Sequence, residues 1–361
     1  MIGIPVTPTE RHTPVRIVHL VPADGIGGVE TAAKSMVAAG DASCRFSLQF
    51  IEPERSAAQG RPGIASLLGA NLRAFRRVTA LDPDVIVCSL WRSVPLALLL
   101  RATRRDTKLA FFVHNDVTMH RLDALLSRIA IRAADAIWGD SAATLAARGV
   151  PKDRGHVISF VTDRFAAPND HDTAPRFVSW GRLTQQKGID RSIRLIAILA
   201  GRGLDVRYDV FGPDGGERAN LEALAHDLGL GDRVRFPGPV QRSALPGIAA
   251  QYRFFLQLSR SEGMCMAAVE AMQLGLVPVA TAVGEMARYV QSGDTGISID
   301  PDRIEAAADA VERLIRDRVA WQRHSDAAAR HWLEAPLYAE DVCRAAHALV
   351  YRGEDLNSVE F

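Results

Sequence analysis

The sequence predicts an α/β protein of two domains, each built on a parallel β-sheet. The chain has 361 residues, which exceeds one ordinary domain and suits two. Hydrophobic residues make up 48 % of it and charged residues 24 %, so two sizeable cores can form. Short β-rich runs alternate with helical patterns on both sides of a polar segment, and such alternation is typical of parallel sheets.

The first half begins with a strand, a glycine loop and a helix. Residues 15–20 form a β-rich run, the loop at 25–28 contains three glycines, and a helical stretch covers 29–39. Further strands are expected at 85–87, 108–113 and 136–138. We place a first domain at residues 15–165, after a polar, flexible tail at residues 1–14.

A polar segment with two prolines, residues 163–175, marks the linker between the domains. The alternation restarts after it, so we expect a second domain at 175–332. A last helix, at about 339–351, belongs to the segment 333–361, which we expect to pack back on the first domain. The strands of the second domain are expected at 177–180, 206–211, 234–236, 254–258 and 277–280.

The formal net charge of +1 is distributed unevenly. Residues 1–168 hold 21 Lys and Arg against 15 Asp and Glu, whereas the remainder holds 22 against 27. Two interpretations stay open: a first domain that faces anionic lipid or a phosphorylated acceptor, or ordinary solvated helix faces. The basic residues concerned are Arg73, Arg76, Arg77, Arg101, Arg104, Arg105 and Lys108.

Cysteine usage and hydropathy favour a cytoplasmic protein. The basic first half adds the expectation of a peripheral position at the inner face of the membrane. The first residues lack the apolar core of a signal peptide, and the longest apolar run, 94–100, is too short to span a membrane. The sequence indicates neither a disulfide framework nor a zinc site, because no C-x-x-C pair exists among Cys44, Cys88, Cys265 and Cys343.

Two glutamates, Glu262 and Glu270, lie eight positions apart where a strand passes into a helix. We expect Glu262 in the loop and Glu270 inside the helix. Carboxylates repel phosphate but accept paired hydrogen bonds from a diol, so both should face hydroxyls, which a nucleotide sugar carries at both ends. Unpaired N–H groups at the helix N-terminus would bind a pyrophosphate; they belong to Met264, Cys265, Met266 and Ala267.

This segment resembles the E-x7-E motif of the retaining glycosyltransferases of family 4. Members of that family have two Rossmann-like domains that face each other across a central cleft, the GT-B type of fold. The resemblance implies that Glu262 holds hydroxyls of the donor sugar and that Glu270 holds the ribose. Two glutamates alone could be solvated helix charges, but Gly263, the apolar helix and the run 275–279 make the match specific.

A second segment, with Gly181, Arg182, Lys187 and Gly188, resembles the G-R-x4-K-G motif of the same family. It lies between a strand and a helix, at the carboxyl edge of a parallel sheet where ligands bind. Two cations there can neutralise the charge that develops on a diphosphate leaving group. Ordinary surface cations are the alternative that this position disfavours.

The first domain contributes a glycine loop and a histidine. The loop is an incomplete dinucleotide fingerprint and could be a simple tight turn, but Gly27 and Gly28 match a Gly-Gly loop that approaches the donor phosphates or the acceptor in family 4. His114 ends a predicted strand, where the family often has a histidine that contacts the donor sugar. A structural histidine is the alternative.

Two features depart from the pattern or compete with it. Glu285, Ala287 and Arg288 replace the second glycine, the proline and the acid of the family's Gly-Gly-x-Pro-Glu segment, which leaves the donor-loop geometry and the choice of sugar open. Residues 82–84 read D-x-D, a metal motif of another transferase fold, but they precede a strand and we interpret them as a turn. We expect no metal and no cofactor.

The resemblance implies transfer of a sugar from a nucleoside-diphosphate sugar to a hydroxyl of a glycan or lipid-linked acceptor, with retention of configuration, in surface polysaccharide or glycoconjugate synthesis. His114, Arg182, Lys187 and Glu262 would form the catalytic set. An inactive partner subunit and a nucleotide-sugar 2-epimerase are the alternatives of similar fold. A phosphorylase needs a longer chain, an NAD dehydrogenase needs a complete glycine fingerprint, and no nucleic-acid partner is expected.

Overall fold

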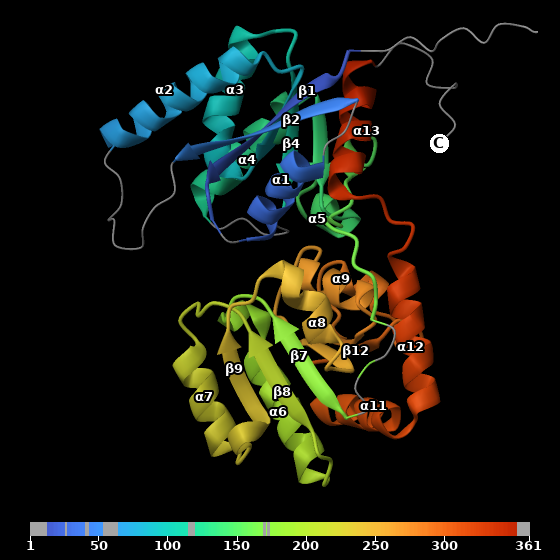
Figure 1. Cartoon of the computed structure of the whole chain (residues 1–361). Helices are drawn as coiled ribbons and strands as arrows, with labels where there is room; N and C mark the ends of the chain where they lie inside the picture. The colour runs from blue at the N-terminus through green and yellow to red at the C-terminus, as the bar shows by residue number, and fades with distance from the viewer. Residues whose placement is uncertain are drawn as a thin grey trace, which may run out of the picture.

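The computed structural model describes residues 13–25, 27–39, 43–52, 64–114, 120–168, 171 and 174–351. The described part contains two six-stranded sheets, each flanked by helices and each belonging to its own domain (Figure 1). Neighbouring strands of the two sheets pair in parallel. The α/β fold with two parallel-sheet domains, expected from the sequence, is confirmed.

The first domain is built on a sheet of order β2-β1-β3-β4-β5-β6. Successive residues of a strand point to opposite faces, so Ile17 joins one core cluster and Val18 the other. Helices α1 and α13 cover the Ile17 face, and α2, α3 and α4 cover the Val18 face. The strands are β1 (Val15–Ala23), β2 (Cys44–Glu52), β3 (Val85–Ser89), β4 (Lys108–Val113), β5 (Ala136–Gly139) and β6 (Gly155–Val157). The helices are α1 (Gly28–Ala39), α2 (Ile64–Leu81), α3 (Val94–Thr103), α4 (Arg121–Ala133), α5 (Ala142–Ala147) and α13 (Tyr338–Val350).

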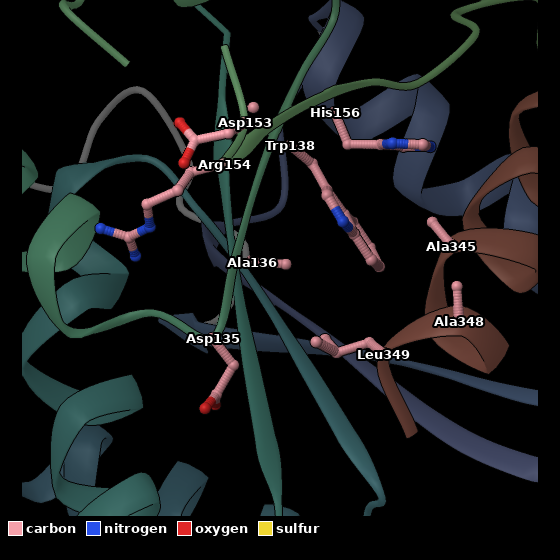
Figure 2. Close-up of a pocket in the computed structure, with 10 residues that line it drawn as sticks. Asp135, Ala136, Trp138, Asp153, Arg154, His156, Ala345, Ala348 and Leu349 are labelled. Atoms are coloured by element: carbon pink, nitrogen blue, oxygen red, sulfur yellow. The ribbon is translucent and has the colours of Figure 1, made fainter. Parts of the chain in front are cut away.

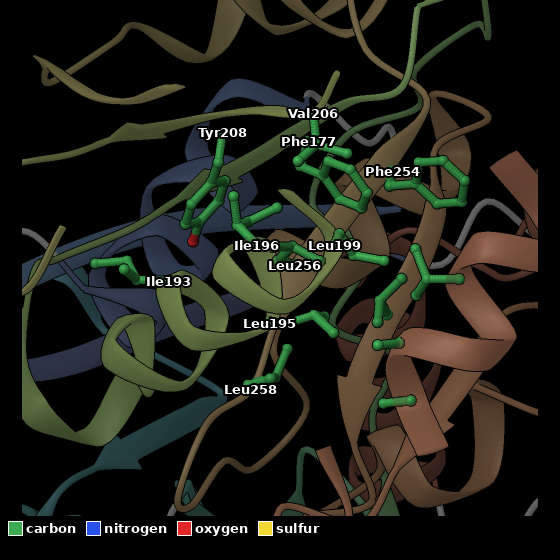
Figure 3. Packing of buried hydrophobic residues seen from close by; sticks show 14 of the residues in the cluster. Phe177, Ile193, Leu195, Ile196, Leu199, Val206, Tyr208, Phe254, Leu256 and Leu258 are labelled. Carbon is green, nitrogen blue, oxygen red and sulfur yellow. The ribbon is translucent and has the colours of Figure 1, made fainter. Parts of the chain in front are cut away.

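The second domain has the strand order β12-β11-β10-β7-β8-β9. Ile193, Ile196 and Leu199, which recur at helical spacing, are fully buried against Phe177 and Phe254 of the sheet (Figure 3). The strands are β7 (Arg176–Trp180), β8 (Arg207–Phe211), β9 (Val234–Gly238), β10 (Phe254–Gln257), β11 (Val277–Thr281) and β12 (Ile297–Ile299). The helices are α6 (Ile189–Gly201), α7 (Arg218–Asp227), α8 (Leu245–Ala249), α9 (Met266–Gln273), α10 (Met286–Tyr289), α11 (Ile304–Arg316) and α12 (Arg318–His331).

Three strands were not expected from the sequence, and all of them lie at sheet edges. β2, β6 and β12 each pair with a single neighbour in their sheet. Their exposed or half-buried positions lack the continuous apolar run that marks a central parallel strand. The helical stretch from Ile304 to His331 consists of two helices that meet at Asp317, whose carboxylate caps α12 by accepting a hydrogen bond from the N–H of Ala320.

The last helix returns to the first domain. After α12 the chain crosses between the domains, and α13 packs beside α1 and β1 (Figure 1). The N–H of Tyr338 donates to the carbonyl of Val161, and the carboxylate of Asp341 accepts from the N–H of Ser159. Among the described residues, none of the helices combines the length and the apolar character needed to cross a bilayer.

A disulfide joins Cys44 at the start of β2 to Cys343 on α13. The expectation that the cysteines form no disulfide is therefore wrong for this pair. The two Cα atoms lie 6.0 Å apart although 299 positions separate the residues in the chain. The pairing depends on the packing of α13 against the first domain, which local sequence does not reveal. His347 lies beside both sulfurs, but sulfurs bonded to each other are not thiolate ligands. Cys88 and Cys265 are free and buried.

We expect reduction of this disulfide to destabilise the first domain. The bond closes a very long loop, and removal of a native disulfide commonly costs about 2–4 kcal/mol. Reductant should therefore lower the melting temperature of the wild type, and Cys343→Ser should have the same effect without reductant. The control is Cys343→Ser with reductant, which should show no further shift. Equal melting temperatures for oxidised and reduced wild type would contradict the expectation.

Candidate active site

Lys187 and Glu262 form an ion pair that joins two loops of the second domain. Lys187 ends a short turn between β7 and α6, and Glu262 lies in the loop between β10 and α9, as expected. β7 and β10 are neighbours in a parallel sheet, so their carboxyl ends bring the two loops together. The Nζ atom of Lys187 lies 2.8 Å from Oε1 of Glu262, and the two side chains are only 21 % and 7 % exposed.

The carboxylate of Glu262 is oriented by further hydrogen bonds. Its Oε1 atom accepts from the hydroxyl of Ser259 at 2.7 Å and from the amide of Gln257 at 3.3 Å. Oε2 accepts no hydrogen bond from the described residues, which leaves one oxygen for a ligand hydroxyl. Neither Ser259 nor Gln257 was predicted from the sequence, although both lie within five positions of Glu262.

Lys187 stays charged in this environment. Burial disfavours its ammonium group, but the charge of Glu262 and the hydrogen bond to it favour the ammonium more, so the pKa of Lys187 is raised. Arg182 lies close enough to oppose this rise slightly. The Arg182 side chain is exposed and forms no hydrogen bond or ion pair with the described residues, so its guanidinium remains open to an anionic ligand.

Gly188 explains why the second motif ends in glycine. Its φ of +62° lies in the left-handed region that L-residues rarely adopt. A Cβ atom there would stand 1.9 Å from the carbonyl oxygen of Leu258 at the end of β10. The backbones of the two loops therefore touch at Gly188, and this close approach lets Lys187 reach Glu262.

The start of α9 carries the N–H groups that were expected to bind an anion. The helix begins at Met266, and the N–H groups of Met264, Cys265, Met266 and Ala267 donate to no described residue. Cys265 adopts a left-handed conformation at the N-cap, with φ of +58°, and the hydroxyl of Tyr289 donates to the carbonyl of Met264 at 2.6 Å. Burial raises the pKa of the Cys265 thiol to about 12, so this cysteine stays neutral.

Glu270 is held inside the second domain rather than left free. Its Oε2 atom accepts the indole N–H of Trp180 at 2.8 Å, and its Oε1 atom accepts from Arg242 at 2.5 Å. Arg242 also pairs with Asp163 at 2.6 Å. Burial raises the pKa of Glu270, although Arg242 and Trp180 oppose the rise. A ribose would therefore meet an anchored carboxylate, and no local sequence signal pointed to Arg242.

Loops of the first domain meet the start of α9. A Cβ atom at Gly28 would lie 3.3 Å from the sulfur of Met266, and one at Gly263 would lie 2.6 Å from Oδ2 of Asp140 and 3.2 Å from the carbonyl oxygen of His114. The side chain of Glu30 fills the space beside Gly27, where a Cβ atom would stand 2.5 Å from Oε2. Gly28 and His114 of the first domain thus lie against the start of α9 and the glutamate loop of the second domain.

His114 lies at the end of β4 and is 7 % exposed. It lines a cavity of about 290 Å³ in the first domain, together with Gly25, Glu30 and Trp91. Its Nε2 atom lies 2.8 Å from the hydroxyl of Ser89. Burial, and to a smaller extent the neighbouring His19, holds the pKa of His114 well below its usual value. The residues that follow it, Asn115 and Asp116, lie outside the described residues.

Glu285, which departs from the family pattern, bridges the two domains. Its carboxylate accepts a hydrogen bond from the N–H of Ala143 in α5 at 3.2 Å and pairs with Arg288 at 3.3 Å. Its own N–H donates to the carbonyl of Gly263. The acid thus fastens the glutamate loop of the second domain to the first, a role that local sequence could not reveal.

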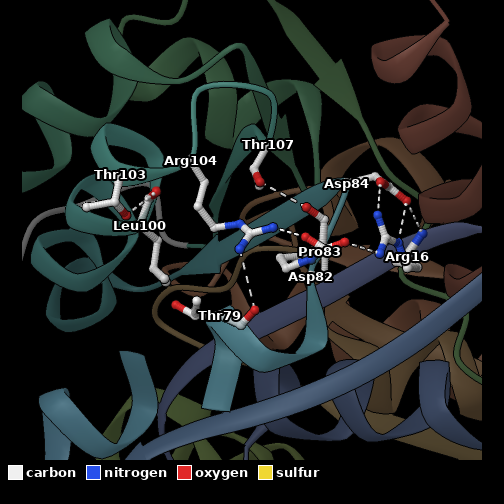
Figure 4. Close-up of polar contacts among 9 residues, drawn as sticks. All are labelled: Arg16, Thr79, Asp82, Pro83, Asp84, Leu100, Thr103, Arg104 and Thr107. Atoms are coloured by element: carbon white, nitrogen blue, oxygen red, sulfur yellow. Dashed lines mark hydrogen bonds and ion pairs between the residues drawn. The ribbon is translucent and has the colours of Figure 1, made fainter. Parts of the chain in front are cut away.

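Two other polar regions hold none of the predicted site residues. A cavity of about 160 Å³ lies between the β5–β6 edge and α13, lined by Trp138, His156 and Leu349 among others (Figure 2). Asp82 and Asp84 precede β3, where Arg16 and Arg104 hold their carboxylates in ion pairs (Figure 4). The carboxylates of the D-x-D segment are therefore engaged in ion pairs with arginines.

The two parallel-sheet domains define the class of fold to which the protein belongs, the GT-B type. The structure of HepE of Anabaena in complex with UDP and glucose matches with a TM-score of 0.75 over 93 % of this chain and 99 % of that chain. The sequence identity is 18 %, so this likeness concerns the fold: two Rossmann-like domains of the GT-B type. Residues 161–332, just under half of the chain, match the family model of glycosyl transferases group 1.

Named relatives agree with the family. The chain is 32 % identical over 181 residues to alpha-D-kanosaminyltransferase of Streptomyces kanamyceticus, covering 50 % of this chain and 46 % of the relative. It is 29 % identical over 260 residues to the lipopolysaccharide core biosynthesis mannosyltransferase LpsB of Rhizobium meliloti, covering 65 % and 72 %. The matches to relatives such as the first span about half of their length.

We expect His19 and His114, which are both buried, to make stability depend on pH. Burial lowers the pKa of His19 to about 3, so below pH ~6.5 the unfolded chain binds a proton that the folded protein does not. The free energy of unfolding should therefore fall with decreasing pH, by about 1.4 kcal/mol per pH unit for each such histidine. Urea unfolding at pH 7, 6 and 5 measures this slope.

His19→Gln should remove one histidine's share of the slope. The matched control is His226→Gln, because the side chain of His226 is 90 % exposed and should leave the slope unchanged. A slope for His19→Gln equal to that of the wild type would contradict a neutral, buried His19.

Proposed function

We propose that the chain is a retaining, metal-independent glycosyltransferase that moves a sugar from a nucleoside-diphosphate sugar to a hydroxyl of a glycan or lipid-linked acceptor. One observation carries the proposal: the Lys187–Glu262 pair and the free N–H groups of α9 meet the loops of Gly28 and His114 from the facing domain. Relatives named as an alpha-D-kanosaminyltransferase and as a mannosyltransferase of lipopolysaccharide core biosynthesis support a role in glycoconjugate synthesis.

The second domain offers a separate partner for each part of such a donor. Arg182, Lys187 and the N–H groups of residues 264–267 supply positive charge for a diphosphate. Oε2 of Glu262 can accept a hydrogen bond from a sugar hydroxyl, and we assign the ribose diol to Glu270, whose carboxylate Trp180 anchors. HepE was crystallised with UDP and glucose, which supports a nucleotide and a sugar as ligands of this fold.

The proposed step needs no nucleophile from the protein. The bond between the anomeric carbon and the diphosphate oxygen breaks, and the acceptor oxygen bonds to that carbon on the same face. The acceptor's proton passes to an oxygen of the leaving phosphate. Arg182 and Lys187 stabilise the negative charge as it develops, and the neutral His114 contributes a hydrogen bond at the sugar.

The donor specificity is the first test. Incubation with a panel of UDP- and GDP-sugars and a hydroxyl acceptor should release the nucleoside diphosphate and label the acceptor. Thermal shifts by UDP or GDP without any transfer would favour an inactive partner subunit, because a ligand of the native state stabilises it. Interconversion of the sugar without acceptor would favour a 2-epimerase.

We expect Glu262→Gln to lower kcat by at least about 100-fold, since the amide neither balances Lys187 nor holds the sugar as a carboxylate does. Steady-state kinetics measure this, with circular dichroism to check folding. The matched control is Glu222→Gln, because Glu222 is exposed on α7 and pairs only with Arg218 among the described residues. Full activity of Glu262→Gln would refute the assigned role.

We further propose that the first domain binds an anionic membrane surface, and that α4 makes the contact. Leu122, Leu125 and Ile129 are 50 %, 55 % and 37 % exposed on one side of this helix, beside the exposed Arg128. The inner residue Asp123 lines the cavity at His114, so the surface adjoins the site. Arg101 and Arg104 take no part, because Asp135 and Asp82 pair with them.

We expect Arg128→Gln to weaken binding to phosphatidylglycerol vesicles about five-fold, because one basic side chain at an anionic surface contributes about 1 kcal/mol. Co-sedimentation at low salt measures the binding, which should fall as salt rises. Arg194→Gln, an exposed arginine on α6 of the second domain, is the matched control and should bind like the wild type. Failure of the wild type to bind such vesicles would refute the membrane contact.

A further inference from the structure

Three buried side chains from neighbouring strands of the first sheet form a hydrogen-bonded chain. His19 lies in β1, Ser89 ends β3 and His114 follows β4. The hydroxyl oxygen of Ser89 lies 2.7 Å from Nε2 of His19 and 2.8 Å from Nε2 of His114. The three residues are 1 %, 0 % and 7 % exposed, so they exchange hydrogen bonds with one another rather than with bulk water.

The number of protons in this chain restricts the two imidazoles. A serine hydroxyl carries one proton, so between two neutral rings it donates to one Nε2 and accepts from the other. Both rings are neutral because burial lowers the pKa of each. The two histidines therefore adopt opposite tautomers: one carries its proton on Nε2 and the other on Nδ1.

The Nδ1 atoms of both rings are enclosed. Neither has a hydrogen-bond partner among the described residues, and both atoms are buried. Of the two rings, His114 is the one that lines the cavity of about 290 Å³. Ser89 is therefore the hydrogen-bond partner that couples the tautomer of His114 to that of His19.

We propose that Ser89 couples the neutral imidazoles of His19 and His114, so that the two rings hold opposite tautomers and Ser89 and His19 act as positioning residues for His114. The ring of His114 is further fixed by stacking on Phe112, with centroids 4.3 Å apart and planes 3° from parallel. The role of His114 toward a sugar rests on the proposed function, but the opposite tautomers do not.

Nitrogen-15 NMR of the histidine rings at pH 7 tests the proposal without any activity assay. The wild type should show one of the two rings protonated on Nδ1 and the other protonated on Nε2, with assignments made by His19→Gln and His114→Gln. The same tautomer on both rings would overturn the proposal. If these tautomers are found but no donor is turned over, the proposal stands and the proposed function fails.

Replacement of Ser89 tests the consequence for catalysis. Ser89→Ala should give a mixture of His114 tautomers and lower kcat about ten- to a hundred-fold, with the KM for the donor within two-fold. Ser89→Thr keeps the hydroxyl and should restore both readouts. The matched control is Ser325→Ala. It removes a buried hydroxyl on α12 that donates to the carbonyl of Gly275 in the second domain. Wild-type kcat and tautomers in Ser89→Ala would overturn the positioning role; if this variant does not fold, the wild-type spectrum and Ser89→Thr still decide.

Discussion

The ion pair between Lys187 and Glu262 is the interaction around which the second domain's site is arranged. The two residues lie 75 positions apart and come from loops that follow neighbouring strands. Each is largely buried, and a buried charge is tolerated when an opposite charge compensates it. The pair fixes the position of the glutamate loop, and it leaves Oε2 of Glu262 without a hydrogen bond from the described residues.

The glutamate loop is also tied to the first domain. Gly263 packs against Asp140 and the backbone of His114, and Glu285 links the carbonyl of Gly263 to the N–H of Ala143. At the other end of the interface the chain crosses back through α13, which the disulfide to Cys44 attaches to β2. The relative position of the two domains, on which a site between them depends, is thus held both beside the site and far from it.

Much of the polar chemistry lies one layer behind the residues that a motif can identify. Arg242 and Trp180 hold Glu270, Ser259 and Gln257 hold Glu262, and Ser89 holds His114. Such supporting groups determine the orientation and the protonation state of the side chains that face a ligand. They come from separate strands and loops, so their spacing in the chain carries no recognisable pattern.

The sequence by itself determined the class of fold, the central strands and the two motifs, because buried parallel strands and βα loops leave local signals in hydrophobic runs, glycines and their spacing. It also placed Glu262 in a loop and Glu270 in a helix correctly. The tertiary structure was needed to find the edge strands β2, β6 and β12, the Cys44–Cys343 disulfide, the bridging role of Glu285 and the His19–Ser89–His114 chain. Each of these depends on contacts between residues that are distant in the chain, and such contacts exist only after the sheets and the two domains have been assembled.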